Sequence, residues 1–122
     1  MLNFKYLFHP SSCGYYCLKK VIKKVDFKRK GYMSLYEIKE ELMKNNYYCF
    51  CCRVKRLGDV KGECFTLINN KTNLHYVIIK RINCKFVYFY DPLFLINRRV
   101  KKDKFIKKWS RICLFYTKIC FC

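Results

Sequence analysis

The chain has 122 residues, 52% of them hydrophobic, so it is long enough to bury one core and too apolar to be disordered. Its 27 Lys and Arg outnumber eight Asp and Glu, and the resulting net charge of +19 favours anionic partners over cationic ones. No apolar run approaches the roughly 18 residues of a membrane span, so the sequence predicts no transmembrane helix.

Two helices are predicted at the start of the chain. Residues 11–25 carry apolar residues at helical spacing with lysines on the opposite face, and one of the serines at their start can cap the first turn. Residues 34–45 are predicted to form a second helix, because Ser34 and Glu37 have the spacing of a capping box. In that motif each side chain accepts a hydrogen bond from a free backbone amide of the other residue.

From residue 47 onward the apolar period changes to two, which indicates strands. The polar stretch 69–73 is predicted to be a long hairpin loop, Asn83 a tight turn, and residues 103–109 a short helix. Helices followed by an antiparallel sheet predict an α+β fold. We expect one domain, with a helical part over about 1–46 and a sheet part over about 47–122. The predicted strands are residues 47–57, 64–68, 75–82, 85–92 and 111–117.

Two basic runs, residues 19–30 and 97–108, are interpreted as solvated helix and loop faces. They would suit nucleic acid if exposed aromatic side chains lay among them on one sheet face. The aromatic residues stand at strand positions that core packing explains equally well.

The ten cysteines are predicted to be mostly free thiols in a reducing, cytoplasmic context, because the chain lacks a secretory signal pattern and has ample apolar content. Cys49 and Cys52 form a Cys-x-x-Cys motif. A zinc site requires four ligands, normally from two such pairs, and only one pair with suitable spacing is present. The sequence therefore predicts no metal and no cofactor.

A candidate site for thiol chemistry involves one cysteine and one histidine. Cys13 stands at the predicted start of the first helix, where free amides and the positive end of the helix dipole favour thiolate. Gly14 would allow a peptide backbone to approach closely. His75 begins one strand and Asp91 ends the next, and antiparallel pairing brings these positions to the same sheet edge. A carboxylate there could orient the imidazole as a base.

Each of these residues also has a plain structural reading. Cys13 could be a buried structural thiol, as most cysteines of such a chain would be. His75 could be a satisfied strand histidine, and Asp91 a turn residue before a proline.

The same segments resemble a known family in order along the chain. "SSCGYYCLKKVI", "SLYEIKEEL", "LHYVIIKRINCKFVYFYDP" and "FIKKWSRICLFYT" resemble the papain-like cysteine peptidase domain of bacteriocin-processing, peptide-exporting ABC transporters. That family cleaves leader peptides after a double glycine. The resemblance implies a half papain-like α+β fold with Cys13 as nucleophile, His75 as base and Asp91 as the residue that orients it.

The resemblance also implies partners and a location. The partners would be the leader peptide of an exported precursor and a membrane-embedded ABC exporter, fused or separate, whose own ATPase binds ATP. The domain would work in the cytoplasm, at the inner face of the membrane through that transporter. Nucleic acid and metal are not expected as partners.

Two departures from the family pattern bear on activity. The family has a Gln six residues before its Cys that donates to the oxyanion, and Leu7 stands at this position here. Loss of one such donor commonly costs on the order of 10² to 10³ in rate. The family's Asp before the Cys is Ser12 here. Three functions remain open: a cysteine endopeptidase, which we favour, an inactive leader-binding module, and a basic nucleic-acid-binding domain.

Overall fold

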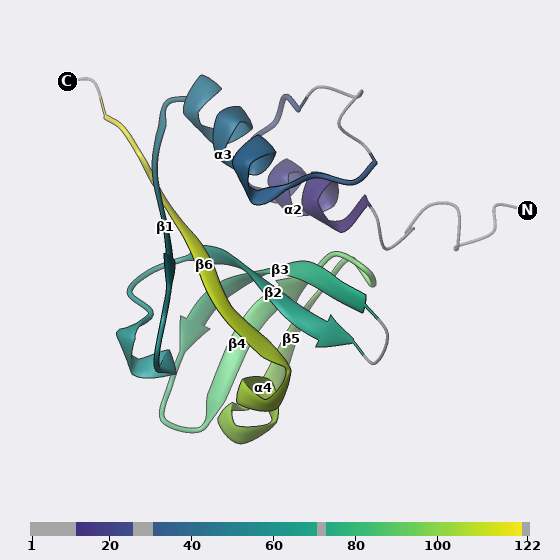
Figure 1. Cartoon of the computed structure of the whole chain (residues 1–122), viewed down its shortest axis with the longest axis vertical. Coiled ribbons are helices and arrows are strands. Elements are labelled where there is room, and N and C mark those ends of the chain that lie inside the picture. Colours follow the sequence, from purple (N-terminus) through teal and green to yellow (C-terminus); the bar gives the residue numbers. More distant parts are fainter. Residues whose placement is uncertain (1–11, 26–30, 71–72, 121–122) are drawn as a thin grey trace, which may run out of the picture.

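The computed structural model describes residues 12–25, 31–70 and 73–120. In this part of the chain two helices precede a six-stranded sheet, and a further helix lies between its last two strands (Figure 1). The predicted α+β fold is confirmed. In chain order the elements are α2 (Cys13–Val21), α3 (Leu35–Lys44), β1 (Tyr47–Arg53), the 3-10 turn η3 (Leu57–Asp59), β2 (Cys64–Asn70), β3 (Asn73–Ile82), β4 (Phe86–Asp91), β5 (Ile96–Lys101), α4 (Lys102–Lys108) and β6 (Trp109–Lys118).

The two N-terminal helices differ in how their first turns are held. In α3 the predicted capping box is present: the Glu37 amide donates to the Ser34 hydroxyl at 3.2 Å, and the Ser34 amide donates to the Glu37 carboxylate at 3.0 Å. Ser12 occupies the N-cap position of α2, but its side chain makes no capping hydrogen bond. Helix α2 also ends at Val21, four residues before the predicted end, where the backbone of Ile22 becomes extended. No helix in the described part of the chain is long and apolar enough to cross a membrane.

The strands form one sheet in the order β1-β6-β2-β3-β4-β5, and all neighbours are antiparallel. The hairpin of β2 and β3 is tighter than predicted, because Asn70 pairs with Asn73 and both strands extend into the expected loop. The predicted turn at Asn83 is present. The side-chain carbonyl of Asn83 accepts hydrogen bonds from the amides of Lys85 and Phe86 at 2.9 and 2.7 Å.

Both faces of the sheet are covered, by different helices. Alternate residues of β3 point to opposite faces. Tyr76 and Ile78 belong to a core shared with α2 and α3, whereas Val77 and Ile79 belong to a second core shared with Phe105 of α4. Figure 1 shows α2 and α3 together at one side of the sheet and α4 at the other. Strand β3 is therefore buried on both faces.

Strand β5 was not predicted from the sequence. The sequence predicts a solvated basic run over residues 97–108, and the structure instead divides this run between a strand and α4. β5 lies at the end of the sheet and exposes most of its side chains, so it lacks the apolar alternation that marks a half-buried strand. It pairs with β4 over its whole length, from Ile96 opposite Asp91 to Lys101 opposite Phe86.

Candidate active site

His75 and Asp91 lie together, as the pairing of their strands predicts. Ile78 of β3 pairs with Tyr90 of β4, which brings the start of one strand beside the end of the other. The His75 Nε2 atom is 3.7 Å from the Asp91 Oδ1 atom, and the two side chains are 3% and 0% exposed. This distance is too long for a hydrogen bond, so the pair is in contact without being bonded.

The Asp91 carboxylate has two other partners. Its Oδ1 atom accepts a hydrogen bond from the Leu93 amide at 3.0 Å, which closes the turn after β4. Its Oδ2 atom accepts one from the Arg98 guanidinium of β5 at 2.8 Å. Sequence reasoning missed Arg98, because it stands in a basic run and no local spacing links it to Asp91.

The His75 imidazole is buried, and neither of its ring nitrogens has a hydrogen-bond partner among the described residues. Burial is the main cause that lowers the pKa of His75 below its ordinary value of 6.5. The Asp91 charge acts against this shift, and the cations Arg98 and Lys108 add to it. His75 is thus placed to accept a proton rather than to carry one.

Cys13 is the first residue of α2, and its sulfur contacts the β3 backbone beside His75. The amide of Tyr76, the residue that follows His75, donates to the Cys13 Sγ atom at 3.2 Å. The cysteine is 6% exposed, and this burial raises the pKa of its thiol. The amides of Tyr76, Gly14 and Cys13 itself lower that pKa, as predicted for a helix start, but they do not outweigh the burial. The helix start therefore favours thiolate as predicted, whereas burial favours the thiol, and the role of Cys13 as nucleophile stays a prediction.

Gly14 lies where α2 packs closely against α3 and β3. A β-carbon at this position would lie 3.2 Å from the Tyr76 ring, 3.3 Å from the Ile38 side chain and 3.3 Å from the Met33 β-carbon. Gly14 thus allows other parts of this chain to pack closely against α2. A contact of Gly14 with the substrate backbone stays a prediction. Leu7, which takes the place of the family's Gln, lies outside the described residues.

The described cysteines are free thiols. Three of them, Cys52, Cys64 and Cys113, come from the neighbouring strands β1, β2 and β6, and the Cys113 thiol donates a hydrogen bond to the Thr66 hydroxyl at 3.7 Å. No group of three or more His, Cys, Asp or Glu in the described part of the chain is arranged to hold a metal ion.

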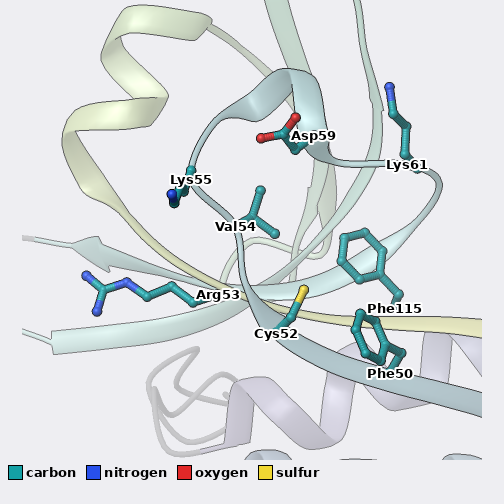
Figure 2. A pocket seen from close by; sticks show the side chains of 8 residues that line it. All are labelled: Phe50, Cys52, Arg53, Val54, Lys55, Asp59, Lys61 and Phe115. Atoms are coloured by element: carbon teal, nitrogen blue, oxygen red, sulfur yellow. The ribbon is translucent and has the colours of Figure 1, made fainter.

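A cavity of about 460 Å³ lies away from the candidate residues, between β1, the segment that follows it and β6. Figure 2 shows Phe50 and Phe115 side by side in its wall, and these two residues are cross-strand partners. None of Cys13, His75 and Asp91 lines this cavity. Its lining residues are Phe50, Cys52, Arg53, Val54, Lys55, Asp59, Lys61 and Phe115.

Comparison with known proteins places the chain in a family. The model of the peptidase C39 family matches residues 50–120, which is more than half of the chain. The chain belongs to the peptidase C39 family. No curated protein matches it.

Solved structures share the C39 fold over nearly the whole chain. The peptidase domain of Streptococcus mutans ComA, in complex with a small-molecule inhibitor, has a TM-score of 0.71 and 17% identity, with 88% of this chain and 93% of that chain covered. A double-glycine-motif protease from an AMS/PCAT transporter, in complex with the leader peptide, has a TM-score of 0.71 and 16% identity, with 88% and 85% covered. The C39-like domain of a toxin secretion ATP-binding protein from Vibrio parahaemolyticus has a TM-score of 0.59 and 9% identity, with 84% and 81% covered. These similarities confirm the papain-like C39 fold.

Proposed function

We propose that this chain is a cysteine peptidase domain that cleaves leader peptides after a double glycine. The observations that carry the proposal are the contact of His75 with Asp91 and the hydrogen bond from the Tyr76 amide, next to His75 in β3, to the Cys13 sulfur, in a chain of the C39 family. The similar structure of a double-glycine protease bound to a leader peptide supports the same substrate class.

In the proposed reaction His75 takes the proton of the Cys13 thiol, and the thiolate attacks the carbonyl carbon of the second glycine. The protonated imidazole then gives its proton to the leaving amine, which leaves a thioester between the leader and Cys13. A water molecule, deprotonated by His75, hydrolyses the thioester and restores the thiol. The Tyr76 amide, which already donates to the sulfur, would stabilise the thiolate that each cycle passes through.

For this reaction the imidazole and the sulfur must approach when substrate binds. In the free chain the His75 nitrogens have no hydrogen-bond partner in the described region, and burial raises the pKa of the Cys13 thiol. Catalytic hydrogen bonds are often long in free enzymes and shorten in the substrate complex. Substrate binding would therefore complete the arrangement.

The test is incubation of the purified chain with a precursor peptide that carries a double-glycine leader, followed by mass spectrometry. We expect a single cut after the second glycine, and no cut by Cys13→Ala, which lacks the nucleophile. Cys17→Ala is a matched control, because Cys17 lies in the same helix but is fully buried. Absence of cleavage by the wild type, or unchanged cleavage by Cys13→Ala, would contradict the proposal.

A second candidate function is a leader-binding module without turnover. The raised pKa of the Cys13 thiol and the unbonded His75 ring favour it, as does the replacement of the family's oxyanion donor by Leu7. Such a module would present leaders to the exporter and leave the cut to another domain.

The variant Leu7→Gln separates the two candidates. If the chain is an enzyme slowed by a missing donor, restoring the amide should raise the cleavage rate by on the order of 10² or more. Leu7→Met, which restores no amide, is the control. Persistent inactivity of Leu7→Gln together with retained leader binding, measured by fluorescence anisotropy, would establish the binding module instead.

The proposed partners follow from the proposed substrate. The domain would act at the cytoplasmic face of the membrane beside an ABC exporter, either fused to it or separate. Purification of a co-expressed exporter would test this association. The chain should be recovered together with the exporter and should be absent when the exporter is omitted.

A further inference from the structure

Arg98 is anchored at the candidate site by three neighbours. Its guanidinium is 2.8 Å from the Asp91 Oδ2 atom. It also lies over the rings of Phe89 and Phe94, at 5.6 and 5.9 Å from their centroids. A guanidinium held by a buried carboxylate and two aromatic faces has little freedom to leave.

The two oxygens of the Asp91 carboxylate are divided between different partners. Arg98 takes Oδ2, and the Leu93 amide takes one lone pair of Oδ1. The second lone pair of Oδ1 remains for the His75 ring, 3.7 Å away. Because two donors on different oxygens fix the rotation of the carboxylate, Arg98 helps to hold one of its oxygens toward the imidazole.

We propose that Arg98 is a positioning residue, which holds the Asp91 carboxylate with Oδ1 toward His75 and keeps the imidazole neutral by its own positive charge. The consequence for cleavage rests on the proposed peptidase function. The effect of Arg98 on the charge of the imidazole does not depend on that proposed function.

The charged groups around His75 determine the sign of the effect. Asp91 of β4 favours the protonated ring, whereas Arg98 of β5 and Lys108 of α4 disfavour it. The Cys13 sulfur of α2 accepts a hydrogen bond from the Tyr76 amide, and burial raises the pKa of its thiol, which favours the uncharged form. Loss of the Arg98 charge removes a repulsion and leaves the Asp91 charge without its strongest partner. Both changes raise the pKa of His75.

The first measurement is an NMR titration of the histidine ring protons in the full chain. The chain has two histidines, so a His9→Gln variant assigns the His75 signal without ambiguity. We expect Arg98→Gln to raise the pKa of His75 and Arg98→Lys, which keeps the cation, to leave it close to the wild-type value. Arg99→Gln is the matched control. It removes the same charge from the next residue of β5, whose guanidinium stacks on Phe86 at 4.4 Å instead of binding Asp91.

The outcomes decide the proposal in each case. A pKa of His75 that rises in Arg98→Gln by more than in Arg99→Gln supports it. Equal shifts in the two variants would mean that Arg98 acts only through the general charge of the surface, and would overturn it. If neither Arg98 variant folds by circular dichroism, Arg98 is required for the fold itself and the positioning role is rejected.

The second measurement is the pH profile of kcat/KM for cleavage of a double-glycine precursor. Arg98→Gln should move the acidic limb to higher pH and lower the plateau by about 10²-fold, the usual cost of a misplacement of about 1 Å. A merely structural role would lower the plateau and leave the limb in place. If the wild type cleaves nothing while the NMR shift occurs, the peptidase proposal fails and the role of Arg98 in setting the imidazole charge stands.

Discussion

At the scale of single residues, the buried His75 ring makes the stability of the fold dependent on pH. Its pKa is lowered in the folded chain, whereas the unfolded chain has the ordinary value of 6.5. Between these two values the unfolded chain binds a proton that the folded chain does not, so the free energy of unfolding falls as the pH falls below about 6.5. Urea denaturation at a series of pH values should show this fall.

The contribution of His75 is isolated by comparison with a variant. His75→Gln cannot titrate, so its free energy of unfolding should decrease less between neutral and mildly acidic pH than that of the wild type. His9→Gln removes the other histidine and serves as the control. Parallel pH profiles for wild type and His75→Gln would show that the buried ring is not responsible.

The residue-level predictions that succeeded depended on short-range geometry. The contact between His75 and Asp91 follows from two strands joined by a short turn, which a sequence reader can recognise. Arg98 could not be found this way, because a basic residue at an exposed strand has no pattern of its own. The protonation of Cys13 was also beyond reach, since it depends on how deeply the sulfur is buried.

At the scale of elements, Gly14 determines how closely α2 packs on α3 and β3. An alanine at this position would place its β-carbon 3.2–3.3 Å from three neighbours. Because the Met33 β-carbon is tied to the backbone, it cannot move aside as a side-chain tip can. We expect Gly14→Ala to lower the free energy of unfolding by about 1–3 kcal/mol, the usual cost of overpacking a core.

Gly58→Ala provides the comparison for this prediction. A β-carbon at Gly58 would meet nothing within 4 Å, so its unfolding midpoint in urea should stay close to that of the wild type. A Gly14→Ala variant as stable as Gly58→Ala would show that the helix can shift to accept the extra carbon.

Buried helices and strands were easier to predict from the sequence than exposed ones. Helix α3 was predicted nearly to its ends, because the Ser34–Glu37 capping box and the following polar asparagines are local signals. Strands β3 and β4 have long apolar runs that fix them. Strand β5 has neither signal, and it is recognisable only through its pairing with β4.

At the scale of the whole molecule, the net charge of +19 makes self-repulsion a general cost of folding. Salt between about 0.01 M and about 1 M shortens the Debye length from about 30 Å to about 3 Å and screens this repulsion. We therefore expect the melting temperature to rise with sodium chloride over this range. A fall would mean that ion pairs such as that of Lys80 and Glu63, 3.0 Å apart, outweigh the repulsion.

Because β5 is an edge strand of the described sheet, it is expected to open more readily than the interior strands. In the described sheet β5 has one neighbouring strand, whereas β3 is flanked by β2 and β4. Edge strands open at a smaller free-energy cost than interior strands, and their backbone amides exchange with deuterium sooner. Each such opening would carry the guanidinium of Arg98 away from the buried carboxylate of Asp91. The imidazole would then face an uncompensated negative charge for as long as the strand stayed detached.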